Sequence, residues 1–141
     1  MTPKTRKLLC IGVPLAALVV VVVVLARTFL LTHPPAGPVV LHCWDGEKAI
    51  AVTLPDDEAQ RVRSIFTGKL KYPESYACGF SSESSVEIGG RLYCLAWDGC
   101  TAVQFGESED IAGTFISISQ RDLDWLADLI EKHGGVYPPF Q

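Results

Sequence analysis

The chain has 141 residues, of which 48% are hydrophobic, and a formal net charge of −4 at neutral pH. All sixteen acidic residues lie after residue 38, together with eight of the Lys and Arg residues, so this part carries a charge of −8. An acidic surface argues against a nucleic-acid partner. A part of roughly 100 residues is long enough for one domain and too short for two.

The N-terminal part predicts a membrane anchor. Residues 1–7 form a basic lead with Lys4, Arg6 and Lys7, and residues 8–31 are almost wholly apolar, including the run Val19–Val24. A bilayer core needs about 20 apolar residues in a helix. Cationic flanks stay on the cytoplasmic side. We therefore expect a single-pass helix at 8–31 in the lipid bilayer, with the N-terminus inside and the rest at the cell surface or in the periplasm.

A cleaved signal peptide is the alternative interpretation of the same stretch. Cleavage near Ala26, with Val24 two residues before it, would release a secreted protein. The apolar stretch is longer than the 7–15 residues typical of a signal peptide, which favours the uncleaved anchor. Residues 32–38 are rich in proline and predict a short, stiff linker.

The first half of residues 39–141 predicts a hairpin followed by a helix. Residues 39–44 and 47–54 alternate as strands, and Asp45-Gly46 between them is a hairpin turn signal. Residues 55–58 open a helix, with proline first and acids in the first turn. Its apolar side chains recur at helical spacing, and Gly68 ends it. The stripe consists of Ala59, Val62, Ile65 and Phe66.

The second half predicts four strands and a final helix. Residues 69–82 are irregular, and strands are expected at 85–88, 91–97, 100–105 and 114–118, the last two flanking an acidic loop at 106–113. Ser119 caps the last helix with Asp122 as its partner, and Gly134-Gly135 ends it. The order β-β-α-β-β-β-β-α predicts an α+β fold, a mainly antiparallel sheet with helices on one face.

Four cysteines lie in this domain, and outside the cytoplasm an even number predicts two disulfides. If Asp98-Gly99 is a two-residue turn, Cys94 lies opposite Val103 and points away from Cys100, which excludes a bridge between these two. Cys43 and Cys94 both occur on strand faces directed to the core. The preferred pairing is therefore Cys43–Cys94 and Cys78–Cys100, the second of which would pin the 69–82 segment to the turn.

The sequence contains no pattern typical of a catalytic or metal site. The cysteines lack the close spacing of zinc and thiol–disulfide motifs. The domain offers only His42 and His133 as bases, and no serine occupies a glycine-flanked elbow. We therefore expect no catalytic residues, no metal and no cofactor.

Aromatic residues near turns and loops are the candidate contacts for a partner, because aromatics anchor protein interfaces. The alternative is that they pack over the edge of a small core. They are Trp44, Tyr72, Tyr76 and Phe80. The sequence thus favours a membrane-anchored, extracytoplasmic and non-enzymatic domain that binds a protein or peptide. A small secreted or anchored hydrolase or thiol enzyme, and a structural or assembly component, are the alternatives.

Overall fold

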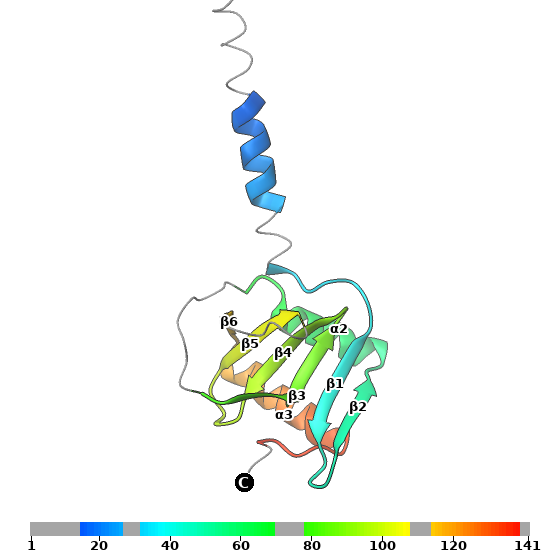
Figure 1. The fold of residues 1–141 in the computed structure, drawn as a ribbon. Coiled ribbons are helices and arrows are strands. Elements are labelled where there is room, and N and C mark those ends of the chain that lie inside the picture. The colour runs from blue at the N-terminus through cyan, green and yellow to red at the C-terminus, as the bar shows by residue number, and fades with distance from the viewer. Residues whose placement is uncertain (1–14, 27–31, 70–77, 108–113, 139–141) are drawn as a thin grey trace, which may run out of the picture. The chain divides into compact units, whose positions relative to one another are not determined.

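The computed structural model describes residues 15–26, 32–69, 78–107 and 114–138, and the chain divides into two compact units, residues 1–31 and 32–141 (Figure 1). In the first unit, residues 15–26 are helical and their side chains are exposed. Within the described segments, no helix has both the length and the hydropathy to span a membrane. The remaining residues of the predicted anchor, 8–14 and 27–31, lie outside the described residues.

The second unit has an α+β fold (Figure 1). The six strands form one antiparallel sheet in the order β2-β1-β3-β4-β5-β6, with the helices α2 and α3 on one face. The element order and the sheet type confirm the prediction. Along the chain the elements are β1 (Val39–Trp44), β2 (Ala49–Thr53), α2 (Asp56–Phe66), β3 (Phe80–Ile88), β4 (Arg91–Ala96), β5 (Ala102–Glu107), β6 (Phe115–Ser117) and α3 (Gln120–Lys132).

The core lies between the sheet and the two helices. The predicted stripe of α2 is buried at Val62, Ile65 and Phe66, and α3 buries its own apolar stripe against the same sheet face. Phe66 stacks on Tyr93 of β4 with ring centroids 4.4 Å apart. Each large apolar side chain buried in this way stabilises the fold by about 1.5–3 kcal/mol. Glu58 of α2 is also buried, which the apolar pattern did not predict.

Residues 32–38 are bonded to the domain. The guanidinium of Arg63 in α2 donates to the carbonyl oxygens of Pro35, at 2.6 Å, and Gly37. Gly89 has a positive φ of 54° and lies against Ala36 so closely that a side chain would collide with the Ala36 carbonyl. The predicted linker therefore packs on the folded unit through its backbone, a set of contacts that proline content alone could not reveal.

The turn between β4 and β5 differs from the prediction by one residue. Cys94 pairs with Gln104, and Leu95 pairs with Val103. With this register the connection is longer than a two-residue turn. Within it, the Asp98 carboxylate accepts the N–H of Cys100 at 3.1 Å, and Gly99 takes a positive φ of 71°. A shift of one residue reverses the face of every side chain in the partner strand. β3 also begins earlier than predicted, at Phe80, with an irregular register before Ser85.

Candidate functional site

Cys43 and Cys94 lie on opposite faces of the sheet. Cys43 follows Leu41 on the face that the helices cover, whereas Cys94 lies level with Ser85 and His42 on the other face. Both side chains are only 1% exposed. The four described cysteines are free thiols. In this register the two side chains point to opposite sides of the sheet, so the expected Cys43–Cys94 bridge cannot form. Because β4 is buried on both faces, burial alone does not predict which face Cys94 occupies.

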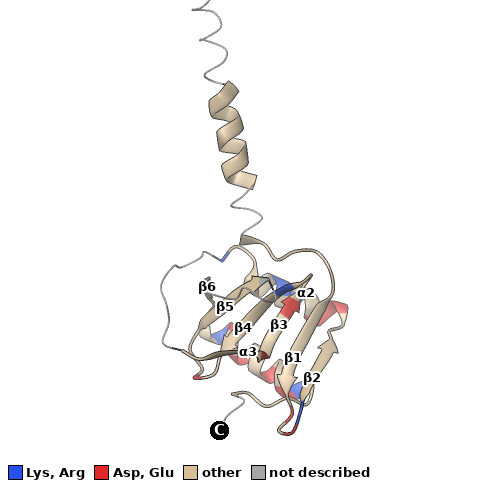
Figure 2. Ribbon diagram, in the orientation of Figure 1, with Lys and Arg blue, Asp and Glu red and all other residues tan. Residues whose placement is uncertain are grey.

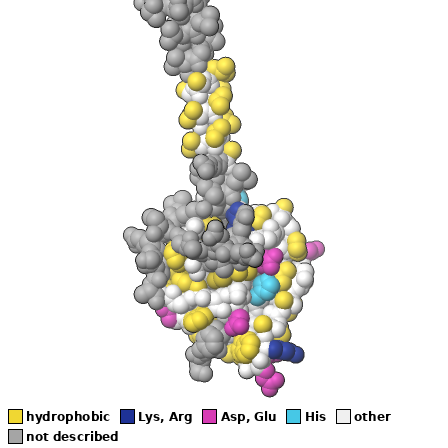
Figure 3. All heavy atoms as spheres, viewed as in Figure 1, with side chains coloured by type: hydrophobic (Ala, Val, Ile, Leu, Met, Phe, Trp, Pro, Cys, Tyr) yellow, Lys and Arg dark blue, Asp and Glu magenta, His cyan; other side chains and the backbone are white. Residues whose placement is uncertain are grey.

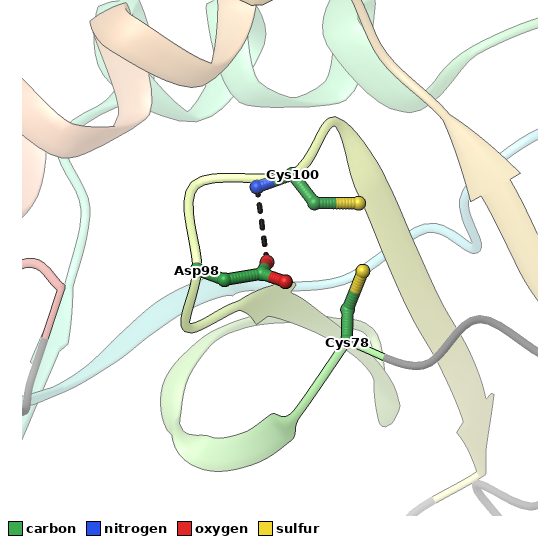
Figure 4. A group of neighbouring side chains, drawn as sticks. All are labelled: Cys78, Asp98 and Cys100. Atoms are coloured by element: carbon green, nitrogen blue, oxygen red, sulfur yellow. Dashed lines mark hydrogen bonds between the residues drawn. The ribbon is translucent and has the colours of Figure 1, made fainter.

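The other two cysteines meet beside an aspartate. The β3–β4 pairing of Phe80 with Ala96 continues outward, because the N–H of Trp97 donates to the carbonyl of Gly79 at 2.9 Å. Cys78 is thereby brought next to the turn after β4. One ligand atom each from Cys78, Asp98 and Cys100 lies within 4.8 Å of the others, and Figure 4 shows the two sulfur atoms facing one another next to the carboxylate.

The two sulfur atoms of this cluster lie in different surroundings. The Sγ of Cys100 accepts the N–H of Ala102 at 3.4 Å. The pKa of Cys78 is raised to about 12, first by its hydrogen bond to Cys100, then by burial and by Asp98. Three groups that can each become anionic therefore share one small volume, and Cys78 keeps its proton at neutral pH.

Tyr137 of the C-terminal segment lies at the border of the same cluster. The hydroxyl of Tyr137 donates to the carbonyl of Ala96 at 2.5 Å, and its ring packs on the core. Burial, followed by the charges of Asp98 and Cys100, raises the pKa of Tyr137 to about 12. Tyr137 is therefore a neutral hydroxyl at the border of the cluster.

Part of this site was predicted from the sequence. The pair Cys78 and Cys100 is brought together as expected, although no bond joins the two sulfurs, and the predicted bridge between them stays a prediction. Asp98 was assigned only to a turn. The spacing Asp-x-Cys within a turn is the sequence signal that could have predicted Asp98 as a neighbour of Cys100. In an Asx turn of this kind both side chains lie on one side of the loop.

The sheet face opposite the helices carries a shallow groove beside β2. It has a volume of about 350 Å³ and is lined by residues of β1 to β4. Within it, Nε2 of His42 lies 3.1 Å from Oε2 of Glu87, and both side chains are partly exposed. Glu83 and Ala51 also line the groove. Figure 3 shows acidic side chains and a histidine on the visible face of the molecule.

Strand β2 is an edge of the sheet and pairs only with β1 among the described strands. The N–H of Leu54 donates to Val39 at 2.9 Å, and an antiparallel ladder alternates between inward and outward groups. The N–H and C=O groups of Ala49, Ala51 and Thr53 therefore point away from β1. The strand has no charged residue, as the tan ribbon of β2 in Figure 2 shows, and its sequence AIAVT contains no proline.

The aromatic candidates do not form one described cluster. Trp44 is half-buried at the end of β1, where its carbonyl accepts the N–H of Val136 at 2.8 Å. Phe80 packs on Phe115 with ring centroids 5.5 Å apart. Tyr72 and Tyr76 lie outside the described residues. The packing of Phe80 on Phe115 agrees with the alternative interpretation, in which the aromatic residues cover the edge of the core.

No family model, no curated protein and no solved structure matches the chain. No family therefore assigns a role to the cysteine cluster or to the edge of β2.

Proposed function

We propose that the chain is a single-pass membrane protein whose extracytoplasmic domain binds an extended segment of a protein or peptide and performs no catalysis. Residues 8–31 are the anchor, with the N-terminus in the cytoplasm. The apolar length of this stretch and its basic lead support this part of the proposal. The outer edge of β2, which no other described strand pairs with, is the observation that supports the binding role.

An open edge of this kind is a template for another strand. Natural sheets usually protect their edges with charged residues, prolines or bulges. β2 has none of these between Lys48 and Pro55, and its register with β1 is regular. An extended peptide could pair with the outward groups of Ala51 and its neighbours and gain main-chain hydrogen bonds along its whole length.

The neighbouring groove indicates which peptide would fit. The side chains of Ala49 and Ala51 are small and exposed, so they leave room for the side chains of an added strand. Glu83 and Glu87 line the groove next to them. Carboxylates favour a cationic partner, so the peptide should carry Lys or Arg at alternate positions, where side chains face the groove.

A substitution on the outward side of β2 tests this binding mode. Ala51→Pro removes one outward N–H without removing a hydrogen bond to β1, and proline is tolerated at such positions of an edge strand. Ala51→Ser is the matched control, because it keeps the N–H and adds only one oxygen atom to the small side chain. The full chain in detergent micelles is used to select peptides from a random display library.

We expect extended basic peptides to be enriched. Their affinity should fall at least about tenfold with Ala51→Pro and should be retained with Ala51→Ser. Peptides that bind both variants equally, or the absence of any enrichment, would contradict edge binding. Circular dichroism of both variants checks that the fold is retained.

If the chain is instead an assembly component, the edge of β2 favours self-association of two copies. Two copies of β2 could pair antiparallel across a two-fold axis, which makes an isologous contact. Light scattering of the full chain in micelles distinguishes the two cases. A dimer that Ala51→Pro converts to a monomer would favour assembly over peptide binding.

The enzyme alternative has one observation in its favour, the contact of His42 with Glu87 in the groove. A carboxylate that orients a histidine is part of many hydrolytic sites. Ser82 lines the same groove. Turnover of ester or peptide substrates that disappears with His42→Gln would favour this alternative.

The anchor is tested by the accessibility of a tagged C-terminus to protease in intact cells. We expect the tag to be removed without lysis, and the mass of the mature chain to include residues 1–26. A protected tag would contradict the topology, and a chain beginning near Arg27 would favour the secreted form.

A further inference from the structure

We propose that Cys78, Asp98 and Cys100 form a binding site for a thiophilic divalent cation, with Zn²⁺ as the best match. Their ligand atoms, two sulfurs and one carboxylate oxygen, all lie within 4.8 Å of one another. Around tetrahedral zinc, with bonds of about 2.3 Å to sulfur and about 2.0–2.2 Å to oxygen, neighbouring ligand atoms lie roughly 3.5–3.8 Å apart. A small contraction of the existing cluster would therefore complete the coordination.

The backbone holds these three residues in place without help from an ion. Cys78 is fixed by the hydrogen bond between Gly79 and Trp97 that extends the β3–β4 ladder. Asp98 and Cys100 are fixed to each other, because one carboxylate oxygen accepts the N–H of Cys100. The carboxylate has a second oxygen, Oδ2, besides the one that accepts this N–H. Such a hydrogen bond orients a ligating carboxylate, as outer-shell contacts do in metal sites.

The charges of the cluster also favour a cation. Two thiols and one carboxylate converge, and over the segments that the structure describes no Lys, Arg or His side chain is bonded to any of them. The Sγ of Cys100 also accepts the N–H of Ala102 at 3.4 Å, which helps to hold this sulfur in place. Soft sulfur ligands select zinc over magnesium or calcium. Three ligands from the protein leave a fourth position for water or for a group of a partner.

A disulfide between Cys78 and Cys100 is the competing use of the same sulfurs. It would satisfy the two thiols, but it would give Asp98 no role beyond the turn. The metal site uses all three convergent groups. The two states are mutually exclusive, and a native disulfide is therefore the outcome that would overturn this proposal.

The test uses the full chain in detergent micelles, reduced and stripped with a chelator, and Zn²⁺ alone as the probe. Equilibrium dialysis with elemental analysis should find one zinc per chain, and Co²⁺ in its place should give thiolate-to-cobalt charge-transfer absorption. Cys78→Ser and Cys100→Ser should abolish both signals. Asp98→Asn should weaken binding at least about tenfold, the loss that removal of an outer-shell partner already causes.

Asp45→Asn is the matched control. Asp45 forms the corresponding turn in the β1–β2 hairpin, where its carboxylate accepts the N–H groups of Glu47 and Lys48, both at 2.9 Å, and no cysteine is part of that turn. This variant should bind zinc as the unchanged chain does. Circular dichroism of every variant checks the fold, and the titration of the unchanged chain decides the question even if a variant fails to fold.

The pH dependence supplies an independent readout. Cysteine binds zinc as the thiolate, so the zinc affinity of the chain should rise between about pH 6 and pH 8. Two results would overturn the proposal. One is a Cys78–Cys100 disulfide in chain alkylated directly in its native membranes, and the other is zinc binding no stronger than that of the Cys78→Ser/Cys100→Ser double variant.

Discussion

The carboxylate of Glu58 in α2 is hydrogen-bonded to the ring of His133 at the end of α3, with Oε2 and Nε2 2.7 Å apart. Its other oxygen is bound by the ammonium of Lys132. The Glu58 side chain is only 7% exposed. One buried carboxylate thus ties together the two helices that cover the sheet. The hydrogen bond from Lys132, followed by that from His133, lowers the pKa of Glu58 against the opposing effect of burial.

Replacing this carboxylate should destabilise the domain in a pH-dependent way. Glu58→Gln should cost about 1–3 kcal/mol in the free energy of unfolding at pH 7, because two charge-assisted hydrogen bonds are weakened. A lowered folded-state pKa contributes stability that is present above the ordinary value of about 4.3 and is lost as pH falls through the folded pKa. The difference between the two chains should therefore shrink below pH 4.

Urea unfolding at several pH values measures this difference. Glu131→Gln is the control, since Glu131 is an exposed residue of α3 and its replacement should change stability by less than about 0.5 kcal/mol. A Glu58→Gln chain as stable as the control at pH 7 would contradict the role of Glu58.

Gly135 should not tolerate a side chain. A Cβ at this position would lie 2.7 Å from the Cβ and Sγ of Cys43 and from a methyl carbon of Ile130. Overpacking of this kind costs about 1–3 kcal/mol, so Gly135→Ala should lower the unfolding free energy by that amount. Thermal denaturation of a double-mutant cycle with Cys43→Ala checks the cause. The second substitution removes the sulfur and should recover part of the loss, whereas strict additivity would contradict the contact.

The elements that were predicted correctly are those that local rules specify. Ser119 caps α3 as expected, since its hydroxyl oxygen accepts the N–H of Asp122 at 3.1 Å and donates to the carboxylate at 2.8 Å. The apolar stripe of α2 is buried because its spacing follows the helical period. Such signals lie within a few residues of one another, so one sequence is enough to identify them.

The features that were missed depend on contacts between distant segments. Cys94 was assigned to the wrong face relative to Cys43, because β4 is buried on both faces and hydrophobicity does not distinguish them. Asp98 was not recognised as a neighbour of Cys78, because only the strand register brings them together. Glu58 is buried by partners at the far end of the chain, His133 and Lys132. No local pattern encodes these relationships.

Two adjacent serines of β3 should respond in opposite directions to the same substitution. The hydroxyl of Ser84 is buried and has no hydrogen-bond partner in the described part of the chain, whereas that of Ser85 donates to the carbonyl of Ser82 at 2.6 Å. An unsatisfied buried polar group costs about 1–3 kcal/mol. Ser84→Ala should therefore leave stability unchanged or raise it, and Ser85→Ala should lower it by about 1 kcal/mol. Chemical denaturation of the two variants provides the comparison, and the reverse order would contradict it.

The four cysteines of the domain should differ sharply in their reactivity toward alkylating reagents. Burial raises the pKa of Cys94 to about 12, and burial together with the charge of Asp45 raises that of Cys43. The thiolate is the reactive form, so both should resist iodoacetamide in the native, reduced, metal-free chain. Cys100 is less buried than these two and should be modified first, whereas the raised pKa of Cys78 should slow the reaction of that thiol despite its partial exposure. Peptide mass spectrometry over a time course measures the order, with the urea-unfolded chain as the control in which all four react. Because Cys43 and Cys94 lie on opposite faces of the sheet, a peptide in an unreduced digest that links them would contradict the strand register itself.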